Sequence, residues 1–288
     1  MEVKEKHDLS PHLEAFSKNG YAIFRNVLDP ELISEASAHV DWLLEKNPGI
    51  RPEQLHHDLM TDDPFWVRLI GDPRLLDIAQ AFIGPNIALF ASHYIAKPPE
   101  SGQAVLWHQD GSYWPLEPME VVTLWLAVTD SNVENGCMRV IPGTQHERLL
   151  TQEELESHDD GTNVLGSGMH VDEIDEAKAV DIELKAGDVS VHHPALIHGS
   201  KGNQSSRWRK GLTIRYIPSS TRILTETWWP SAFLLRGEPV EGVNRYRPYP
   251  KFAEDRHMPF QDADAWNVKC ATTNARYGIG AQGKVHGA

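Results

Sequence analysis

The sequence has few cysteines and no long apolar run. Only two of its 288 residues are cysteines, Cys137 and Cys270, too few to suggest a disulfide framework or a zinc knuckle. No stretch approaches the roughly 18 apolar residues that a membrane-spanning helix needs. Residues 1–7 are charged and lack the apolar core of a signal peptide. We therefore expect a cytoplasmic protein that does not bind membranes.

Basic side chains are also in short supply. The chain carries 27 Lys and Arg against 41 Asp and Glu, a formal net charge of −14. Nucleic-acid binding needs basic patches to neutralise phosphates, so the charge argues against that class of partner. Internal repeats and low-complexity linkers are absent from the sequence as well, which favours a single domain over 1–288. We expect a small-molecule partner and consider a homo-oligomer possible.

The first eighty residues are patterned mainly for helices. Asn19-Gly20 and Gly84-Pro85 are helix stop signals, and Asp29-Pro30 is a helix start. The predicted helices cover 8–20, 31–46, 64–68 and 73–83, with a strand over 21–28. We describe this part as a helical section, about 8–84.

From residue 87 the pattern changes to short runs of β-forming residues between turns. The predicted strands cover 87–97, a segment leading into His108, 121–129, 137–144, 189–193 and 211–217. Residues 151–179 are polar, and we expect a long excursion over the site there, a candidate lid. Helices followed by evenly spaced strands predict a mainly β fold with flanking helices (α+β), an antiparallel barrel or jelly roll. The β core would span about 87–217, and a C-terminal extension, 218–288, would cover the opening or contact another subunit.

A candidate metal site lies in Trp107-His108-Gln109-Asp110-Gly111. In an extended strand, His108 and Asp110 would point to one face and could bind one metal ion together. A second histidine would complete the facial triad that leaves open positions on non-haem Fe(II). His198 is one candidate for that ligand. Composition alone does not select it over the other histidines considered, His93, His146, His170, His192 and His193.

Arg209 follows His198 by eleven residues and precedes the last predicted strand. A guanidinium in a metal-containing cavity is suited to a bidentate grip on a carboxylate. A co-substrate that chelates iron at one end and carries a carboxylate at the other would need such a partner. Because Lys201, Arg207 and Lys210 lie nearby, a solvated basic turn is the alternative interpretation.

Taken together, these segments resemble the phytanoyl-CoA dioxygenase family. The resemblance runs from about Phe16 to Ile217. It rests on His108-Gln109-Asp110, residues 135–146, Gly187-Asp188, His198-Gly199-Ser200 and Arg209-Lys210-Gly211. It implies an oxygenase that depends on Fe(II) and 2-oxoglutarate, uses O2, and has a double-stranded β-helix fold, a cupin-like jelly roll.

The resemblance also implies roles for individual residues. His108, Asp110 and His198 would bind the iron. Arg209 would bind the distal carboxylate of 2-oxoglutarate, and the other implied co-substrate contacts are Ser200, Trp125, Thr123 and Lys97. Related halogenases lack the carboxylate that Asp110 supplies, so hydroxylation is the implied reaction. We expect no catalytic side chain beyond the iron centre.

The substrate is harder to predict. Aromatic side chains at Tyr113, Trp114 and Trp228 could surround an ammonium group, although each could equally pack in the core or at its rim. Arg215 and Arg276 could bind an anionic group. The 107–114 run is similar to bacterial family members that hydroxylate aminoalkylphosphonates beside phosphorus. This similarity implies 2-aminoethylphosphonate or its N-trimethyl analogue as the substrate.

Three alternatives remain open. A hydroxylase of a fatty acyl-CoA, lipid or secondary metabolite would fit the family, but the sequence offers no basic track for the CoA phosphates. A non-catalytic cupin-like binding protein would have no need of a carboxylate clamp such as Arg209 with Ser200. A zinc hydrolase would need a nearby Glu base, and Glu117 and Glu120 are only loosely placed for that role.

Overall fold

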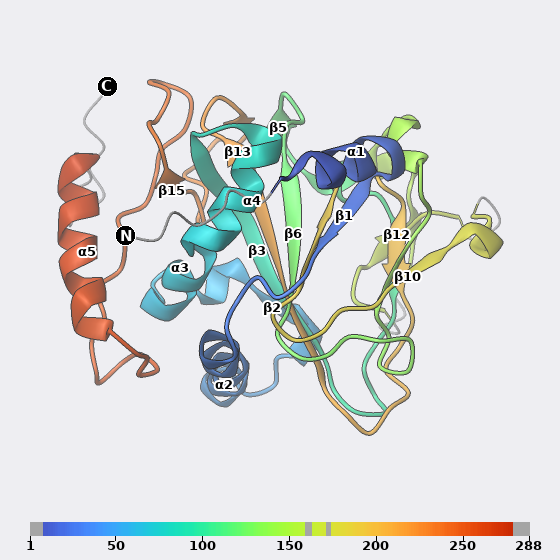
Figure 1. Ribbon diagram of the computed structural model, residues 1–288, viewed down its shortest axis with the longest axis horizontal. Coiled ribbons are helices and arrows are strands. Elements are labelled where there is room, and N and C mark those ends of the chain that lie inside the picture. Colours follow the sequence, from blue (N-terminus) through green and yellow to red (C-terminus); the bar gives the residue numbers. More distant parts are fainter. Residues whose placement is uncertain (1–7, 159–162, 171–173, 279–288) are drawn as a thin grey trace.

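Two antiparallel sheets form the centre of the molecule (Figure 1), in a computed structural model that describes residues 8–158, 163–170 and 174–278. The larger sheet has the strand order β1-β11-β6-β13-β3-β15, with β2 also paired to β3, and the smaller has the order β10-β7-β12-β4. Their strands are β1 (Tyr21–Phe24), β2 (Leu55–His56), β3 (Ile87–Lys97), β4 (Val105–His108), β6 (Val122–Ala127), β7 (Met138–Val140), β10 (Val180–Ile182), β11 (Val189–His192), β12 (His198–Ser200), β13 (Arg209–Pro218) and β15 (Phe233–Arg236). This arrangement confirms the predicted jelly roll.

The two faces of the larger sheet have different neighbours. On β6, Leu124 and Leu126 belong to a core shared with the helices, whereas Trp125 and Ala127 pack with Met138 and other residues between the two sheets. The alternation follows from the period of two along a strand. It aims the odd-numbered side chains of β6 and β13 into the barrel.

Three of the helices begin within one residue of the predicted start, because an Asp-Pro pair caps each of them. The carboxylates of Asp29, Asp63 and Asp72 each accept a hydrogen bond from a backbone amide in the first turn of the helix that follows. The helices of this section are α1 (Ser10–Asn19), α2 (Pro30–Lys46), α3 (Pro64–Ile70) and α4 (Pro73–Ile83). None of the described helices is long and apolar enough to cross a membrane.

The strand predictions were less accurate at their ends. The strand predicted over 137–144 is shorter in the structure, where only β7 forms. The strands β10, β12 and β15 were not predicted. Short pairs formed by β5 (Leu116–Glu117) with β14 (Arg222–Ile223), and by β8 (Glu156–Ser157) with β9 (Ser167–Gly168), were also missed.

The C-terminal extension divides between two positions. β15 joins the edge of the larger sheet beside β3, and α5 (Ala263–Arg276) lies on the side of the molecule opposite β10 and β12 (Figure 1). The buried residues of α5 are Trp266, which stacks on Tyr249, and Cys270. The helix therefore extends the core and does not cover the barrel.

Candidate metal centre and its cavity

Three donor side chains meet inside the barrel. His108 ends β4, His198 begins β12, and the two residues face each other in the antiparallel pairing of these strands. Asp110 starts a short 3-10 helix, Asp110–Tyr113, so the prediction that it shares a strand with His108 was wrong. Ligand atoms of the three residues nevertheless lie within 4.8 Å of one another, and all three are buried.

Backbone carbonyls fix the protonation of both histidine rings. Nδ1 of His108 lies 2.7 Å from the Leu106 carbonyl oxygen, and Nδ1 of His198 lies 2.9 Å from that of Leu196. Because a carbonyl oxygen only accepts, each Nδ1 carries the proton and each Nε2 is left as a free donor to a metal. Burial also holds the pKa of His198 well below its usual value, so this ring stays neutral.

Asp110 supplies the negative charge of the group. Burial alone would raise its pKa, but the Arg215 guanidinium and the neighbouring histidines hold it well below the usual value. Its Oδ1 lies 3.6 Å from His108 Nε2, while its Oδ2 lies 3.4 Å from both Thr123 Oγ1 and His192 Nε2. Two imidazoles that present Nε2 and one carboxylate fit a divalent non-haem iron with three open positions.

A cavity opens beside these donors. Of the predicted site residues, Trp125, Ser200, Arg209 and Arg215 line it together with the three donors. Val164 and Leu165 also line it, so these two residues of the 151–179 excursion reach the site. Residues 159–162 and 171–173 of the candidate lid lie outside the described residues.

Arg209 lines the cavity and has a hydrogen-bond donor without a partner among the described residues. Its Nη1 donates to the Gly136 carbonyl at 2.8 Å and its Nη2 to the Ile95 carbonyl at 3.2 Å. Its buried Nε has no partner among the described residues, nor does any described carboxylate pair with the guanidinium. The guanidinium stands 5.2 Å from the Trp125 ring centroid. Burial lowers the pKa of Arg209 to about 10, which leaves it charged at neutral pH.

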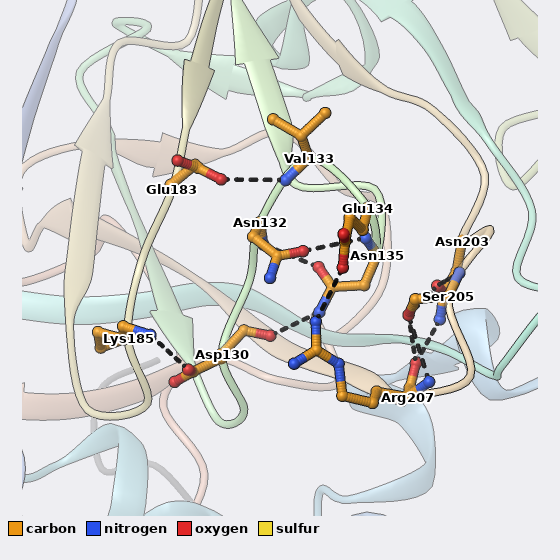
Figure 2. A network of polar contacts seen from close by, with 10 residues as sticks. All are labelled: Asp130, Asn132, Val133, Glu134, Asn135, Glu183, Lys185, Asn203, Ser205 and Arg207. Carbon is orange, nitrogen blue, oxygen red and sulfur yellow. Dashed lines mark hydrogen bonds and ion pairs between the residues drawn. The ribbon is translucent and has the colours of Figure 1, made fainter.

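The turn that presents Gly136 to Arg209 is held by a network of polar contacts (Figure 2). Asn132 and Asn135 exchange bonds between side chains and backbone amides, and the Asn135 amide also donates to the Asp130 carbonyl. Gly136 has φ +76°, and a Cβ there would lie 2.4 Å from the Lys201 carbonyl oxygen. The predicted Asn-Gly turn therefore positions one acceptor of Arg209.

Two of the predicted co-substrate contacts reach the cavity only through a neighbour. Lys97 is buried and donates to Ser200 Oγ at 2.7 Å and to the Lys201 carbonyl. Thr123 bonds to Asp110, as described above. Both are placed to orient a residue that lines the cavity.

The predicted substrate residues lie in different parts of the structure. Trp114 stacks under the Arg215 guanidinium at 5.2 Å, and Tyr113 lies 6.1 Å from the His108 ring while its hydroxyl donates to the Ser167 carbonyl. Trp228 lines a second cavity instead. Arg276 is not brought to the site: it lies on α5, is 61% exposed and pairs with Glu238.

Among the residues of this cavity that sequence reasoning missed, three have polar side chains. His192 and His93 had been considered only as rivals for the third metal ligand, and Thr213 had not been considered. The alternation along β13 could have identified Thr213, since it lies between Arg209 and Arg215 on the inward face.

Comparisons with known proteins agree with this geometry. The model of the family described as "Phytanoyl-CoA dioxygenase (PhyH)" matches residues 16–211. The peroxisomal phytanoyl-CoA dioxygenase of Rattus norvegicus is 28% identical over 284 residues, covering 88% of this chain and 79% of that protein. The Bos taurus protein is 33% identical over 152 residues, covering 51% of this chain and 44% of that protein.

Another relative and two solved structures extend the comparison. A probable alpha-ketoglutarate-dependent hypophosphite dioxygenase of Stutzerimonas stutzeri is 28% identical over 148 residues, 51% of each chain. The apo structure of the non-heme monooxygenase ThoJ is 26% identical, with a TM-score of 0.70 and coverage of 91% of this chain and 95% of that one. The epimerase SnoN, in complex with Fe3+, alpha ketoglutarate and nogalamycin RO, is 20% identical with a TM-score of 0.63, covers 81% of this chain and 96% of that one, and shares the fold.

Proposed function

This chain belongs to the phytanoyl-CoA dioxygenase family of iron- and 2-oxoglutarate-dependent dioxygenases, and from that premise we propose that it hydroxylates a C–H bond of a small polar molecule. Our best candidate is an aminoalkylphosphonate, 2-aminoethylphosphonate or its N-trimethyl analogue, attacked at the carbon next to phosphorus. The observation that carries the proposal is the buried His108, Asp110 and His198 cluster, which faces a cavity that Arg209 also lines.

The iron ligands are assigned by chemistry and placement. His108 and His198 offer Nε2 atoms whose tautomers are fixed by backbone carbonyls, and Asp110 offers Oδ1. Thr123 and His192 contact the other oxygen of Asp110, which keeps that carboxylate from turning. When bound, the iron and 2-oxoglutarate supply the oxidising power for inserting one atom of O2 into a C–H bond.

The co-substrate is held by the opposite end of the cavity. Arg209 would grip the distal carboxylate of 2-oxoglutarate, since its unpartnered Nε and buried charge suit an anion. Ser200 would add a hydroxyl contact, oriented by Lys97. The Trp125 ring forms one wall and keeps water away from the guanidinium.

The phosphonate of an aminoalkylphosphonate suits the remaining space, because the Arg215 guanidinium lines the cavity and can bind an anion. The Stutzerimonas stutzeri relative acts, by its name, on hypophosphite, a reduced phosphorus anion. A shared preference for phosphorus-containing anions is consistent with this choice.

Turnover tests the proposal. Purified protein with Fe(II), 2-oxoglutarate and O2 should release succinate only when 2-aminoethylphosphonate or its N-trimethyl analogue is present. The Arg276→Gln variant should match the wild type, since Arg276 is exposed and pairs with Glu238. No succinate above background with either compound would refute the substrate. Activity supported by zinc without iron would instead favour the hydrolase.

A further inference from the structure

We propose that Arg215 is the anchor for an anionic group of the substrate, and that the oxidised carbon lies within one or two bonds of that group. The inference rests on the proposed function and deepens it. It extends the substrate class to small organic anions in general: phosphonates, sulfonates or carboxylates.

The first support is the layout of β13. Arg209, Thr213 and Arg215 all line the cavity from this one strand. Leu212 and Ile214 point the other way, into the core shared with the helices. Six residues of strand span about 20 Å, so the two guanidinium groups extend from well-separated points of this strand. Because the distal carboxylate of 2-oxoglutarate needs only Arg209, Arg215 is left for a second anion.

The second support is that Arg215 is poorly satisfied. Its side chain is 13% exposed, yet its nearest carboxylate contact, Nη2 to Asp110 Oδ1, is 3.7 Å, too long for a hydrogen bond. Its Nε is buried and has no partner among the described residues. A buried guanidinium with open donors is costly, and an anion that fills them removes that cost. A metal bound to Asp110 would neutralise much of the charge of that carboxylate, so Arg215 would need another anionic partner even more.

The surroundings of Arg215 leave its charge uncompensated on the other sides. His93 lines the cavity, and His57 lies near the guanidinium. Burial, with added repulsion from Arg215, lowers the pKa of His93 to about 3 and that of His57 to about 4, so both rings are neutral. The Trp114 ring covers one face of the guanidinium and leaves the edge, where the N–H groups lie, open to a ligand.

Distance then limits the substrate. An anion oxygen bound by Arg215 Nη2 lies one charge-assisted hydrogen bond, about 2.8 Å, from that nitrogen. Because the same nitrogen is 3.7 Å from Asp110 Oδ1, the anion lies within about 6–7 Å of a proposed metal ligand. Only a short carbon chain fits between the anion and the reacting carbon. Behind Trp114, Phe90 contacts its ring and stacks on Trp229 at 4.9 Å, in an apolar cluster that offers no partner for a second charged group.

A competing role for Arg215 is simply to hold Asp110. The two roles differ in what Arg215→Gln would change. If Arg215 holds Asp110, the substitution weakens iron binding whichever ligand is present. If Arg215 binds the anionic group of the substrate, the substitution weakens the binding only of ligands that carry that group.

The test uses calorimetric titration under anaerobic conditions with Fe(II) and saturating 2-oxoglutarate. The probes are 2-aminoethylphosphonate, 2-aminoethanesulfonate, 3-aminopropanoate and 3-aminopropanamide, which keeps the ammonium group but has no anionic group. The proteins are the wild type, Arg215→Gln, Arg215→Lys and the exposed control Arg276→Gln. We expect at least one anion to bind the wild type thirtyfold or more tightly than the amide. Arg215→Gln should lose that preference, Arg215→Lys should keep part of it, and Fe(II) affinity should change less than threefold.

Three results would overturn the anchor: no anion binds the wild type, the amide binds as tightly as the anions, or Arg215→Gln binds anions normally. Loss of Fe(II) affinity in Arg215→Gln, with the anion preference intact, would assign the residue to Asp110 instead. The same samples separate this proposal from the previous one. If the wild type gave no Fe(II)–2-oxoglutarate absorption band but bound anions through Arg215, the oxygenase proposal would fail and the anion anchor would stand.

Discussion

Gly211 offers a sharp test of how the co-substrate end of the cavity is built. It lies on β13 between Arg209 and Thr213, on the inward face, and the Trp125 ring lies directly over it. A Cβ at this position would be 2.1 Å from Trp125 Cζ2 and 2.6 Å from Cη2. Because Trp125 is 4% exposed and packed between the sheets, Gly211→Ala forces the ring to move against a filled core.

The expected cost follows from overpacking. Inserting one carbon into a well-packed core destabilises by about 1–3 kcal/mol. In a protein of this size the melting temperature falls by about 2 °C for each kcal/mol of lost stability. The melting temperature of Gly211→Ala should therefore be about 2–6 °C lower. The displaced ring would also move away from the Arg209 guanidinium, which lies 5.2 Å from the ring centroid in the wild type. We expect affinity for 2-oxoglutarate to fall about tenfold, equivalent to about 1.4 kcal/mol.

A double-mutant cycle isolates the contact. Trp125→Phe removes the benzo ring that the new Cβ would strike, so Gly211→Ala should cost less than about 0.5 kcal/mol in that background. Unfolding in denaturant gives the stabilities, and anaerobic titration with 2-oxoglutarate gives the affinities. Strictly additive losses would refute the placement of Trp125 over Gly211, because the two changes would then act independently.

Further changes probe the rest of the molecule. Arg209→Met should weaken 2-oxoglutarate binding by about 2–5 kcal/mol, because a buried charge pair loses one partner, and an unchanged titration curve would contradict its role. Tyr94→Phe removes the hydroxyl bonded to His39 Nδ1 at 3.2 Å and should cost about 1–3 kcal/mol in urea unfolding, with 2-oxoglutarate affinity unaltered. Burial would raise the pKa of Asp188, but Arg25 and two backbone amides hold it below 3.8. Because the pKa of Asp188 is lower in the folded state than in the unfolded state, its carboxylate stabilises the fold at pH values above the unfolded pKa. This contribution is lost as the pH falls through the folded-state pKa. Asp188→Asn should therefore lower stability at pH 6, and its deficit should shrink in unfolding curves taken below pH 3.8.

Local signals explain which parts of the fold could be predicted. The Asp-Pro caps fix the starts of α2 and α4 within the chain itself, so these helices were placed to within a residue. β12 was missed because it is three residues long, contains Gly199 and is bulged against β4. α5 was missed because only Trp266 and Cys270 are buried on it, which leaves no clear apolar stripe.

The candidate site depended on contacts that no local pattern contains. His198 meets His108 only through the register of β12 against β4, and residues alone could not select it from the other histidines. Resemblance to a family supplied that choice. Arg276 was nominated for its charge, but charge does not reveal that a residue lies on an outer helix beside Glu238. Arg215 was nominated on the same basis and does line the cavity, because it falls on the inward face of β13.

The most direct test of the account is the visible charge-transfer band that Fe(II) gives when 2-oxoglutarate chelates it under anaerobic conditions. We predict a band in the wild type that disappears in His198→Ala, and that Arg276→Gln retains. A wild type that binds iron without producing the band, or a His198→Ala variant that keeps it, would contradict the assignment of His108, Asp110 and His198 as the iron ligands of a 2-oxoglutarate-dependent dioxygenase.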